Sequence, residues 1–467
     1  MATIGFTRQC IDGVSTFRKQ NCKFSALFLP FAILAGAPIF AQAITLEELA
    51  QKLEAVEKQN AELQAKVRKL ESEQNKQAAQ VQQQAVAVEQ AQQTASTAVQ
   101  ASSAASWAAN TSISSYGEIG YSRPTRAAQN TQVDVGRAVI GITHRFDDKT
   151  KFVGEFEYEH AIVSSTDRGE AEVEQLYVER EFKNGLRAKA GLHLMPAGFL
   201  NQTHEPTTYH GVFRNFVEST IIPTTWREAG LGLSGTTSGA LSWDFGLTTG
   251  FDLAKWDVNA TEGRIRGPLQ ATHGEGQFAN ARDLSTYAAL NWRGIPGLQI
   301  GGFIFAGKVG HRRDNFNSTT HNSSLTLYDL HARYQVSGWD FSALYSRGSI
   351  SNTEGVNTNL SAAATAANPT LIPSKFYGGY VQAAYKLLQW EDYSLHPFAR
   401  YERFNTAAGY GSLSAATPGA VAQPDENVFT AGLTLRVGKG VVLKTDYQKF
   451  GTDSSRDRFN VGMGYSF

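Results

Sequence analysis

Apolar and polar residues alternate with a period of two at the C-terminal end of the chain. Phe459, Val461, Met463, Tyr465 and Phe467 fall on one face, and glycines or small polar residues separate them. This pattern is typical of a strand with lipid on one side and water on the other. A soluble edge strand can show the same alternation. Because few soluble proteins end on such a strand, the ending favours a strand of a membrane barrel.

The same alternation returns from Ser115 onward in segments of about ten residues, the length of a tilted membrane strand. Connections alternate between short turn sequences, such as Ser337-Gly338, and long segments, such as 195–226 and 252–283. The predicted strands lie near 115–122, 133–146, 150–162, 171–183, 185–194, 227–235, 241–251, 284–293, 298–308, 323–336, 339–347, 375–388, 394–404, 427–437, 440–449 and 458–467. The expected fold is all-β, a transmembrane antiparallel β-barrel of about 16 strands, with short periplasmic turns and long external loops.

Aromatic residues cluster at the predicted strand ends. We expect them to form girdles at the two membrane interfaces, where an amphipathic ring lies between headgroups and acyl chains. The residues concerned are Tyr121, Tyr158, Phe182, Trp292, Tyr334, Trp339, Phe404 and Phe450.

A heptad repeat precedes the barrel. One seam position reads Leu46, Leu53, Asn60 and Val67, and the other reads Leu49, Val56, Leu63 and Leu70. This spacing predicts a self-associating α-helical coiled coil rather than one amphipathic helix lying on another surface. The seam then weakens among Gln, Ala and Ser. We therefore expect a periplasmic coiled coil over 44–75, a helix fading to a linker over 76–113, and the outer-membrane barrel over 114–467.

Residues 1–43 have the features of a secretory signal peptide. Basic residues precede an apolar run from Phe24 to Ala37, and Ala41-Gln42-Ala43 is a small-x-small cleavage site. The run is shorter than the ~20 apolar residues that a membrane helix needs. A retained N-terminal anchor is the alternative. Both cysteines of the chain fall within this segment, so the processed chain is expected to have no disulfide.

Charge and motifs exclude several classes of function. The chain has 43 basic and 43 acidic residues, which is no footprint of a nucleic-acid-binding protein. No Gly-x-Ser-x-Gly element, P-loop or dinucleotide fingerprint occurs. His204-Glu205 and His210 do not have the spacing of a metalloprotease site. We expect no catalytic residues, no metal, no cofactor and no enzymatic activity.

Two motifs carry a resemblance to a known family. The stretches PAGFLNQTHEP (196–206) and IIPTTWREAGLGLSG (221–235), after a coiled-coil start, resemble porins of the phosphate-selective porin O/P superfamily, near its trimeric dicarboxylate-channel relatives. By motif the resemblance covers only about 187–235. It implies a homotrimeric, sixteen-stranded diffusion channel for small, often anionic, solutes. The coiled coil alone leaves dimer and trimer open, because Asn60 at its seam position often favours dimers. In general porins the third external loop narrows the lumen, and here that loop would be 195–226.

Charged residues near this loop are candidates for setting solute selectivity. Arg214 and Arg227, with His204 and His210, would attract anions at the narrowest ring, where pore charges act most strongly. Arg137, Arg145, Arg187 and Lys189 share lumen-facing parity and would form a basic track, opposed by Glu155 and Glu157, while Glu205 lies in the loop itself. The alternative is that these charges only solvate a wide lumen and pair with each other. Near charge balance in the barrel argues against phosphate selectivity.

The expected function is an outer-membrane porin, a water-filled channel for passive diffusion of small hydrophilic solutes with a weak preference for anions. The expected partners are further copies of the chain, outer-membrane lipid and small solutes, without nucleic acid. The alternative is a structural protein whose coiled coil tethers the outer membrane towards the cell wall.

Overall fold

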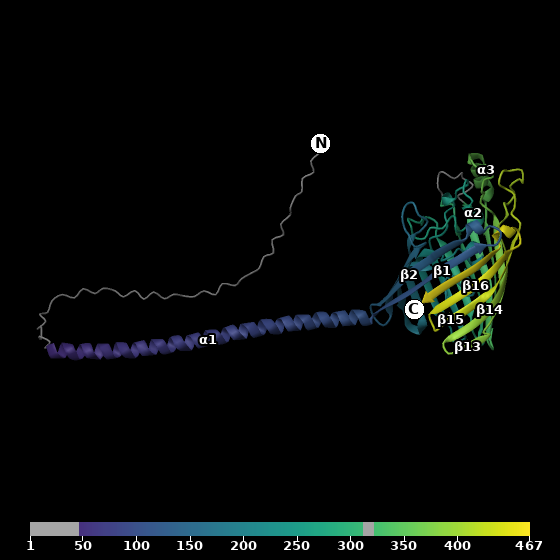
Figure 1. Ribbon diagram of the computed structural model, residues 1–467. Helices are drawn as coiled ribbons and strands as arrows, with labels where there is room; N and C mark the ends of the chain where they lie inside the picture. The colour runs from purple at the N-terminus through teal and green to yellow at the C-terminus, as the bar shows by residue number, and fades with distance from the viewer. Residues whose placement is uncertain (1–45, 312–321) are drawn as a thin grey trace, which may run out of the picture. The chain divides into compact units, whose positions relative to one another are not determined.

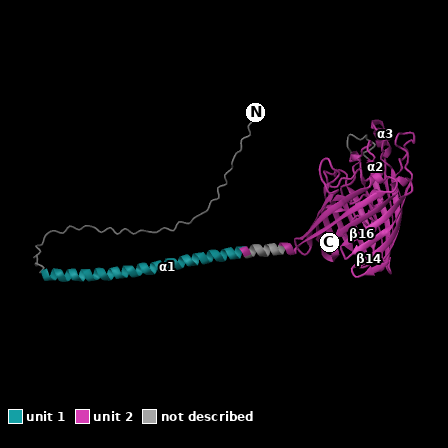
Figure 2. Ribbon diagram, in the orientation of Figure 1, with its two compact units in different colours: residues 1–96 teal, residues 97–467 magenta. Residues whose placement is uncertain are grey.

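The computed structural model describes residues 46–311 and 322–467. The predicted signal peptide, 1–43, lies outside the described residues. The chain divides into two compact units, Met1–Ser96 and Thr97–Phe467 (Figure 2). None of the helices in the described part of the chain has the length and apolar character needed to cross a bilayer.

The first element is one long helix, α1 (Leu46–Ala109, 64 residues). Its predicted seam residues are exposed, from 49% for Val67 to 89% for Leu46. The helix continues through the segment that was expected to fade into a linker, and only Asn110 separates it from the first strand. Gln and Ala, which dominate that segment, are good helix formers, and the sequence prediction gave this too little weight.

The second unit is a sheet of antiparallel strands (Figure 1). The strands are β1 (Thr111–Pro124), β2 (Gln132–Arg145), β3 (Thr150–Glu159), β4 (Ala171–Glu181), β5 (Arg187–Leu194), β6 (Arg227–Thr236), β7 (Leu241–Thr248), β8 (Ser285–Trp292), β9 (Leu298–Lys308), β10 (Ser324–Val336), β11 (Trp339–Ile350), β12 (Lys375–Tyr385), β13 (Leu388–Trp390), β14 (Tyr393–Gly409), β15 (Glu426–Val437), β16 (Val441–Phe450) and β17 (Arg458–Ser466). The connections contain two short α-helices, α2 (Glu262–Ile265) and α3 (Thr353–Ala363), and the helical turns η1 (Ala128–Asn130), η2 (Lys183–Gly185), η3 (Val217–Ile221), η4 (Leu253–Lys255) and η6 (Ser454–Arg456).

The sheet closes on itself as a barrel. Each strand pairs with its neighbour in sequence, and β17 pairs with β1, Ser466 opposite Tyr116 and Val461 opposite Tyr121. The short segment β13 continues β12, because both pair with β14. The described residues therefore form a closed antiparallel barrel of sixteen strands. The prediction of about sixteen antiparallel strands is confirmed, as is the closure of the last strand against the first.

The connections follow the predicted alternation. The β10–β11 turn, Ser337-Gly338, has φ of +50° and +87° at its two residues, the combination that a tight two-residue hairpin turn requires. The long connections, with α2 and α3, gather at the other end of the barrel from such turns (Figure 1). This arrangement places every long connection where it can fold over or into one mouth of the barrel.

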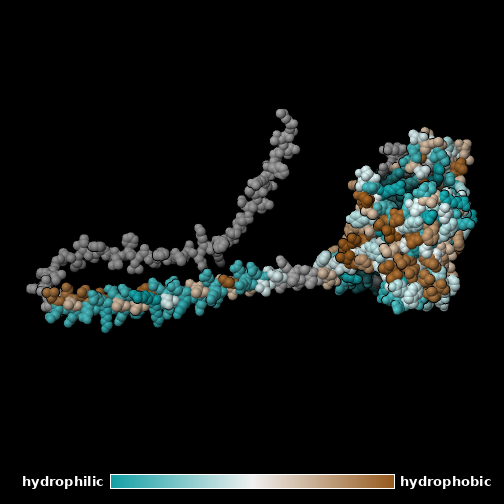
Figure 3. Space-filling view, viewed as in Figure 1, coloured by the Kyte–Doolittle hydropathy of each residue, from teal (hydrophilic) through white to brown (hydrophobic). Residues whose placement is uncertain are grey.

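The outer surface of the barrel is apolar. In β17, Phe459, Val461 and Met463 are 43–44% exposed, whereas Asn460 on the other face is fully buried. Figure 3 shows hydrophobic side chains gathered over this surface. Alternation of this kind places apolar groups outside and polar groups inside.

Two of the aromatic residues predicted for the interfacial girdles point inward instead. Phe404 and Phe450 are 6% and 3% exposed, and both rings contact Phe216 of the connection 195–226. In contrast, Tyr158 and Trp339 are exposed on the outer surface. The girdle assignment of Phe404 and Phe450 is wrong because their strand parity matches the inward face.

The inside of the barrel contains a hydrophobic core. Long connections supply part of it, including Ile221, Trp226, Phe251 and Leu269, and they pack on inward side chains of β8 to β15 such as Phe305. The space left open inside is therefore narrower than sixteen strands alone would enclose. A polar cavity lies on the side of β3, β4 and β6.

Candidate functional site: a loop across the barrel lumen

The connection 195–226, called the lumen loop below, folds into the barrel. Its backbone N–H groups donate to carboxylates on the inward faces of three strands. Gly198 donates to Asp329 of β10 at 2.9 Å, Phe216 to Glu402 of β14 at 2.7 Å, and Val212 to Asp446 of β16 at 2.6 Å. Asp329, Glu402 and Asp446 are at most 2% exposed. The lumen loop is therefore anchored at several points around the wall.

Glu218 fastens the lumen loop to itself and to the wall. Its carboxylate accepts hydrogen bonds from the N–H groups of Phe199 at 2.5 Å and Leu200 at 2.8 Å, from Asn215 Nδ2 at 2.8 Å, and from the Tyr380 hydroxyl of β12 at 2.9 Å. Such a carboxylate, 3% exposed, meets most of its hydrogen-bonding capacity inside the protein. The result is a loop of fixed shape.

A charged cluster joins the lumen loop to β1, β2 and β3. The Arg137 guanidinium lies 3.1 Å from Glu118 and 3.9 Å from Glu157, and it donates to the carbonyl oxygen of His204 at 2.6 Å. Tyr209 of the loop donates to Glu118 at 2.7 Å. Three of the residues predicted as selectivity candidates, Arg137, Glu157 and His204, are thus brought together.

Three of the remaining basic candidates, Arg227, Lys189 and Arg214, also form ion pairs or hydrogen bonds. Arg227 pairs with Glu172 and, at 3.3 Å, with Glu275. Lys189 pairs with Asp244 at 3.0 Å. Arg214 donates to the hydroxyls of Thr224 and, at 3.0 Å, Thr225, while Arg187 is half-buried on β5 and Arg145 is exposed at the end of β2.

No continuous basic track connects Arg137, Arg145, Arg187 and Lys189. Strands β3 and β4 separate β2 from β5, and their inward face carries Glu155, Glu157 and Glu172. The track prediction is wrong, because lumen-facing parity on two strands does not make those strands neighbours.

The two histidines of the lumen loop do not supply fixed positive charge. Burial, together with the field of Arg436, lowers the pKa of His210 to about 3. Burial also lowers the pKa of His204 below its usual range. His210 stacks on Phe398 and its Nδ1 lies 3.3 Å from the Thr434 hydroxyl. Burial thus disfavours the charged form of both imidazoles.

Basic side chains line a neighbouring arc of the wall. Arg400, Arg436, Lys444 and Arg458 point inward from β14 to β17. Arg436 donates to the carbonyl oxygen of Thr207 at 2.9 Å, and the Lys444 ammonium lies 3.6 Å from the centre of the Tyr209 ring. These four side chains, called the basic arc below, share β14 to β17 with the inward carboxylates Glu402 and Asp446, and Arg400 pairs with Glu402 at 2.8 Å. Carboxylates form an acidic arc on β3 and β4.

A polar cavity of about 510 Å³ lies beside the acidic arc. Its carboxylates are Glu157, Glu159, Glu170, Glu172, Glu262 and Glu275, and its basic groups are Arg168, Arg227, Lys255 and Arg266. The cavity is lined by strands β3, β4 and β6 and by the long connections. Space of this size and polarity can hold water and small hydrophilic solutes.

Several residues of the site were not predicted from the sequence. Tyr116 and Glu118 could have been predicted, because the alternation of the first strand places both side chains on its inward face. Glu174 could not have been predicted in this way, because a bulge shifts the pairing register of β3 and β4 between Glu155 and Phe156. Without that bulge, Glu174 would fall on the outer face with Leu176. A charge on the lipid face of a predicted strand was the only hint. Glu205, a predicted candidate, is half-buried, and its Oε2 has no partner among the described residues.

Comparison with known proteins gives one likeness of fold. No family model matches the chain. An uncharacterized protein of Aquifex aeolicus (strain VF5) is 28% identical over 342 residues, covering 72% of this chain and 74% of the relative. OmpF of Salmonella typhi, solved in complex with daunomycin, superposes with a TM-score of 0.53 at 14% identity, over 76% of this chain and 97% of OmpF. The outer membrane channel DcaP of Acinetobacter baumannii gives a TM-score of 0.47 at 11% identity, over 76% of this chain and 97% of DcaP. The first of these structures shows that the barrel has the OmpF fold.

Proposed function

We propose that this chain, which shares the barrel fold of OmpF, is an outer-membrane channel for passive diffusion of small hydrophilic solutes. The observation that carries the proposal is the lumen loop, held inside a closed barrel that is apolar outside and charged inside. A closed barrel satisfies every strand's backbone groups and can span lipid. A loop across its lumen narrows the passage and limits the size of what crosses. No chemical reaction is part of the proposal.

The charges of the lumen bear on the class of solute. Arg137, Lys189 and Arg227 each pair with a carboxylate, so their fields are partly cancelled. The weak anion preference expected from the sequence therefore depends on Arg436, Lys444 and Arg458 of the basic arc. We propose a channel of modest selectivity rather than a phosphate-specific one. Membership of the phosphate-selective porin O/P superfamily stays a prediction from the two motifs.

Recordings in planar bilayers test this proposal. With purified protein under a KCl gradient, we expect stepwise currents and a small reversal potential of anion sign. The basic arc favours anions, and the paired charges elsewhere favour neither ion. A large reversal potential of cation sign would overturn the solute preference but not the channel.

The exposed stripe of α1 supports self-association through a periplasmic coiled coil. Leu49, Leu53, Val56 and Leu63 are 52–62% exposed, and burying them between helices would remove apolar area from water. We propose that three copies associate, as the family resemblance implies. The tether to the cell wall stays the alternative role of this helix.

Replacing both Leu53 and Leu63 with glutamate is expected to weaken this association. Each change places a charge at a seam position, where it would be buried in a coiled coil. In detergent, cross-linking should yield fewer trimers than for the unaltered chain. The matched control is the exchange of Glu54 and Glu62, outside the seam, for glutamine. Equal trimer yields for the two double variants would count against the coiled coil.

A further inference from the structure

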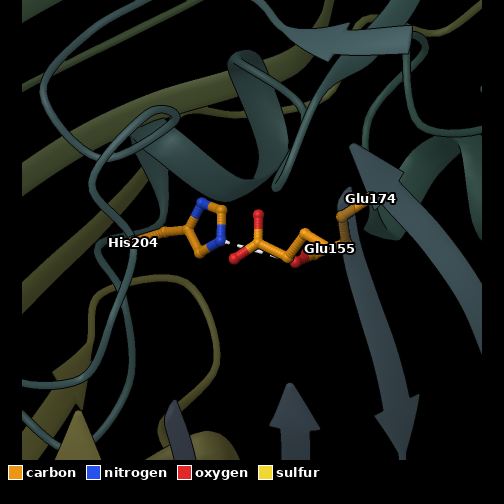
Figure 4. Close-up of side chains that lie close together, drawn as sticks. All are labelled: Glu155, Glu174 and His204. Atoms are coloured by element: carbon orange, nitrogen blue, oxygen red, sulfur yellow. Dashed lines mark ion pairs between the residues drawn. The ribbon is translucent and has the colours of Figure 1, made fainter. Parts of the chain in front are cut away.

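A group of three possible metal ligands lies where the lumen loop meets the acidic arc. Glu155 comes from β3, Glu174 from β4 and His204 from the lumen loop (Figure 4). One ligand atom of each lies within 4.8 Å of the other two, and Glu174 Oε2 is 3.7 Å from His204 Nε2. Two ligands of a tetrahedral zinc ion would be about 3.4 Å apart. Small movements would therefore bring the three groups onto one ion.

The carboxylate of Glu174 is buried without full compensation. The residue is 0% exposed, and the Tyr116 hydroxyl donates to its Oε2 at 2.8 Å. Its Oε1 has no hydrogen-bond partner among the described residues. Within the same residues, neither Glu155 nor Glu174 forms an ion pair with a lysine or arginine. Burying a carboxylate with an unused acceptor position costs free energy, and a bound cation or a proton would offset that cost.

The orientation of His204 leaves a ligand atom free. Its Nδ1 lies 2.9 Å from the carbonyl oxygen of Asn201, and a carbonyl only accepts, so Nδ1 carries the proton. The lone pair of Nε2 then faces Glu174 and the Tyr116 hydroxyl, 2.6 Å away. Histidines that bind metals are commonly held in this way, with the other ring nitrogen donating to a carbonyl.

The Tyr116 hydroxyl cannot satisfy both of its neighbours. It has one proton, yet it lies within hydrogen-bond distance of the lone pair on His204 Nε2 and of the Glu174 carboxylate. Whichever atom receives the proton, the other keeps an unused lone pair. This shortage of hydrogen-bond donors is independent of the clustering of carboxylates. It is a second observation that indicates a bound cation at this position.

A second group of acidic side chains lies on the same strands. Glu157, Glu159 and Glu172 also place ligand atoms within 4.8 Å of one another. Glu157 is 3% exposed, and its Oε1 has no hydrogen-bond partner in the described part of the chain. The Arg137 guanidinium lies 3.9 Å from Glu157 and forms a closer ion pair, at 3.1 Å, with Glu118. Acidic groups with unpartnered oxygen atoms therefore extend beyond the three-ligand group.

We propose that Glu155, Glu174 and His204 bind one divalent transition-metal ion, with Zn²⁺ as the best match. One imidazole and two carboxylates suit zinc, whereas Mg²⁺ and Ca²⁺ prefer oxygen ligands alone. The ion would join the lumen loop to β3 and β4, on the far side of the loop from the anchors on β10 and β14. The site does not depend on what the channel transports.

Zinc binding to the purified full-length protein in detergent tests the proposal. After treatment with a chelator and removal of that chelator, titration with Zn²⁺ alone should show one ion bound per chain. His204→Gln and Glu174→Gln should each lower the affinity at least tenfold. The control His273→Gln removes a histidine that pairs with Glu275 elsewhere and should bind as the unaltered chain does.

Two measurements keep the result decisive. The shift in gel mobility between unheated and boiled samples reports whether each variant has a folded barrel. Should a variant fail to fold, Co²⁺ bound to the unaltered chain is expected to give visible absorption bands typical of nitrogen and oxygen ligands. The proposal would be overturned if the unaltered chain bound Zn²⁺ no more tightly than His204→Gln, or if Co²⁺ gave no such bands. Either result would show that protons, and not a metal ion, neutralise the group. Neither result depends on ion currents, so the channel proposal is judged separately.

Discussion

Replacing Glu218 with alanine is expected to release the lumen loop and raise the single-channel conductance. Four donors, from Phe199, Leu200, Asn215 and Tyr380, lose their common acceptor in a site that is 3% exposed. Leaving buried donors unpaired in this way costs about 3–5 kcal/mol of stability. The loop would then fluctuate within the lumen, and current traces from planar bilayers should show larger steps and more noise.

Two further variants bracket this expectation. Glu218→Gln keeps one acceptor oxygen and should give an intermediate conductance. Asp148→Ala removes an exposed carboxylate in the short turn between β2 and β3, outside the polar cavity, and its loss should leave both conductance and stability near those of the unaltered chain. Equal conductance for Glu218→Ala and the unaltered chain would show that the loop does not limit the passage.

Replacing Trp226 with alanine is expected to cause a large loss of stability. The indole is 1% exposed, and its ring centre lies 4.8–5.7 Å from those of Phe251, Phe303 and Phe305. Its Nε1 donates to Glu228 at 2.9 Å. Truncation removes the aromatic packing, leaves a cavity and leaves the buried Glu228 carboxylate with the Thr249 hydroxyl as its side-chain donor, so we expect a loss of about 3–5 kcal/mol.

The measurement is the urea or heat midpoint of unfolding in detergent, followed by gel mobility. Trp390→Ala is the control, because Trp390 is 45% exposed on the outer surface and lies outside this core. A midpoint for Trp226→Ala as high as that of Trp390→Ala would mean that the core inside the barrel contributes little to its stability.

The barrel could be predicted because its pattern is local. Each strand alternates between lipid and lumen, as in β17, so a period of two identifies both the strand and its faces. Turn sequences such as Ser337-Gly338 then set the order of the hairpins. Strand existence, direction and closure followed from these features, and all three are confirmed.

The interior was harder to predict because its contacts join distant parts of the chain. The bond between Val212 and Asp446 links residues 234 positions apart. The inward parity of Phe404 and Phe450 could be read from their strands, but nothing near them in the sequence indicates that Phe216 of the lumen loop packs on them. Glu174 was assigned no role because a single bulge reverses strand parity. Charge type and approximate location were predictable, but the pairing of those charges was not.

We propose that the barrel encloses a continuous aqueous path beside the lumen loop. The current that the purified full-length protein passes in a planar lipid bilayer tests this path. We expect discrete, reproducible conductance steps that appear on insertion and persist at low voltage. A protein that shows the gel mobility of a folded barrel, inserts into the bilayer and gives no steps would contradict it.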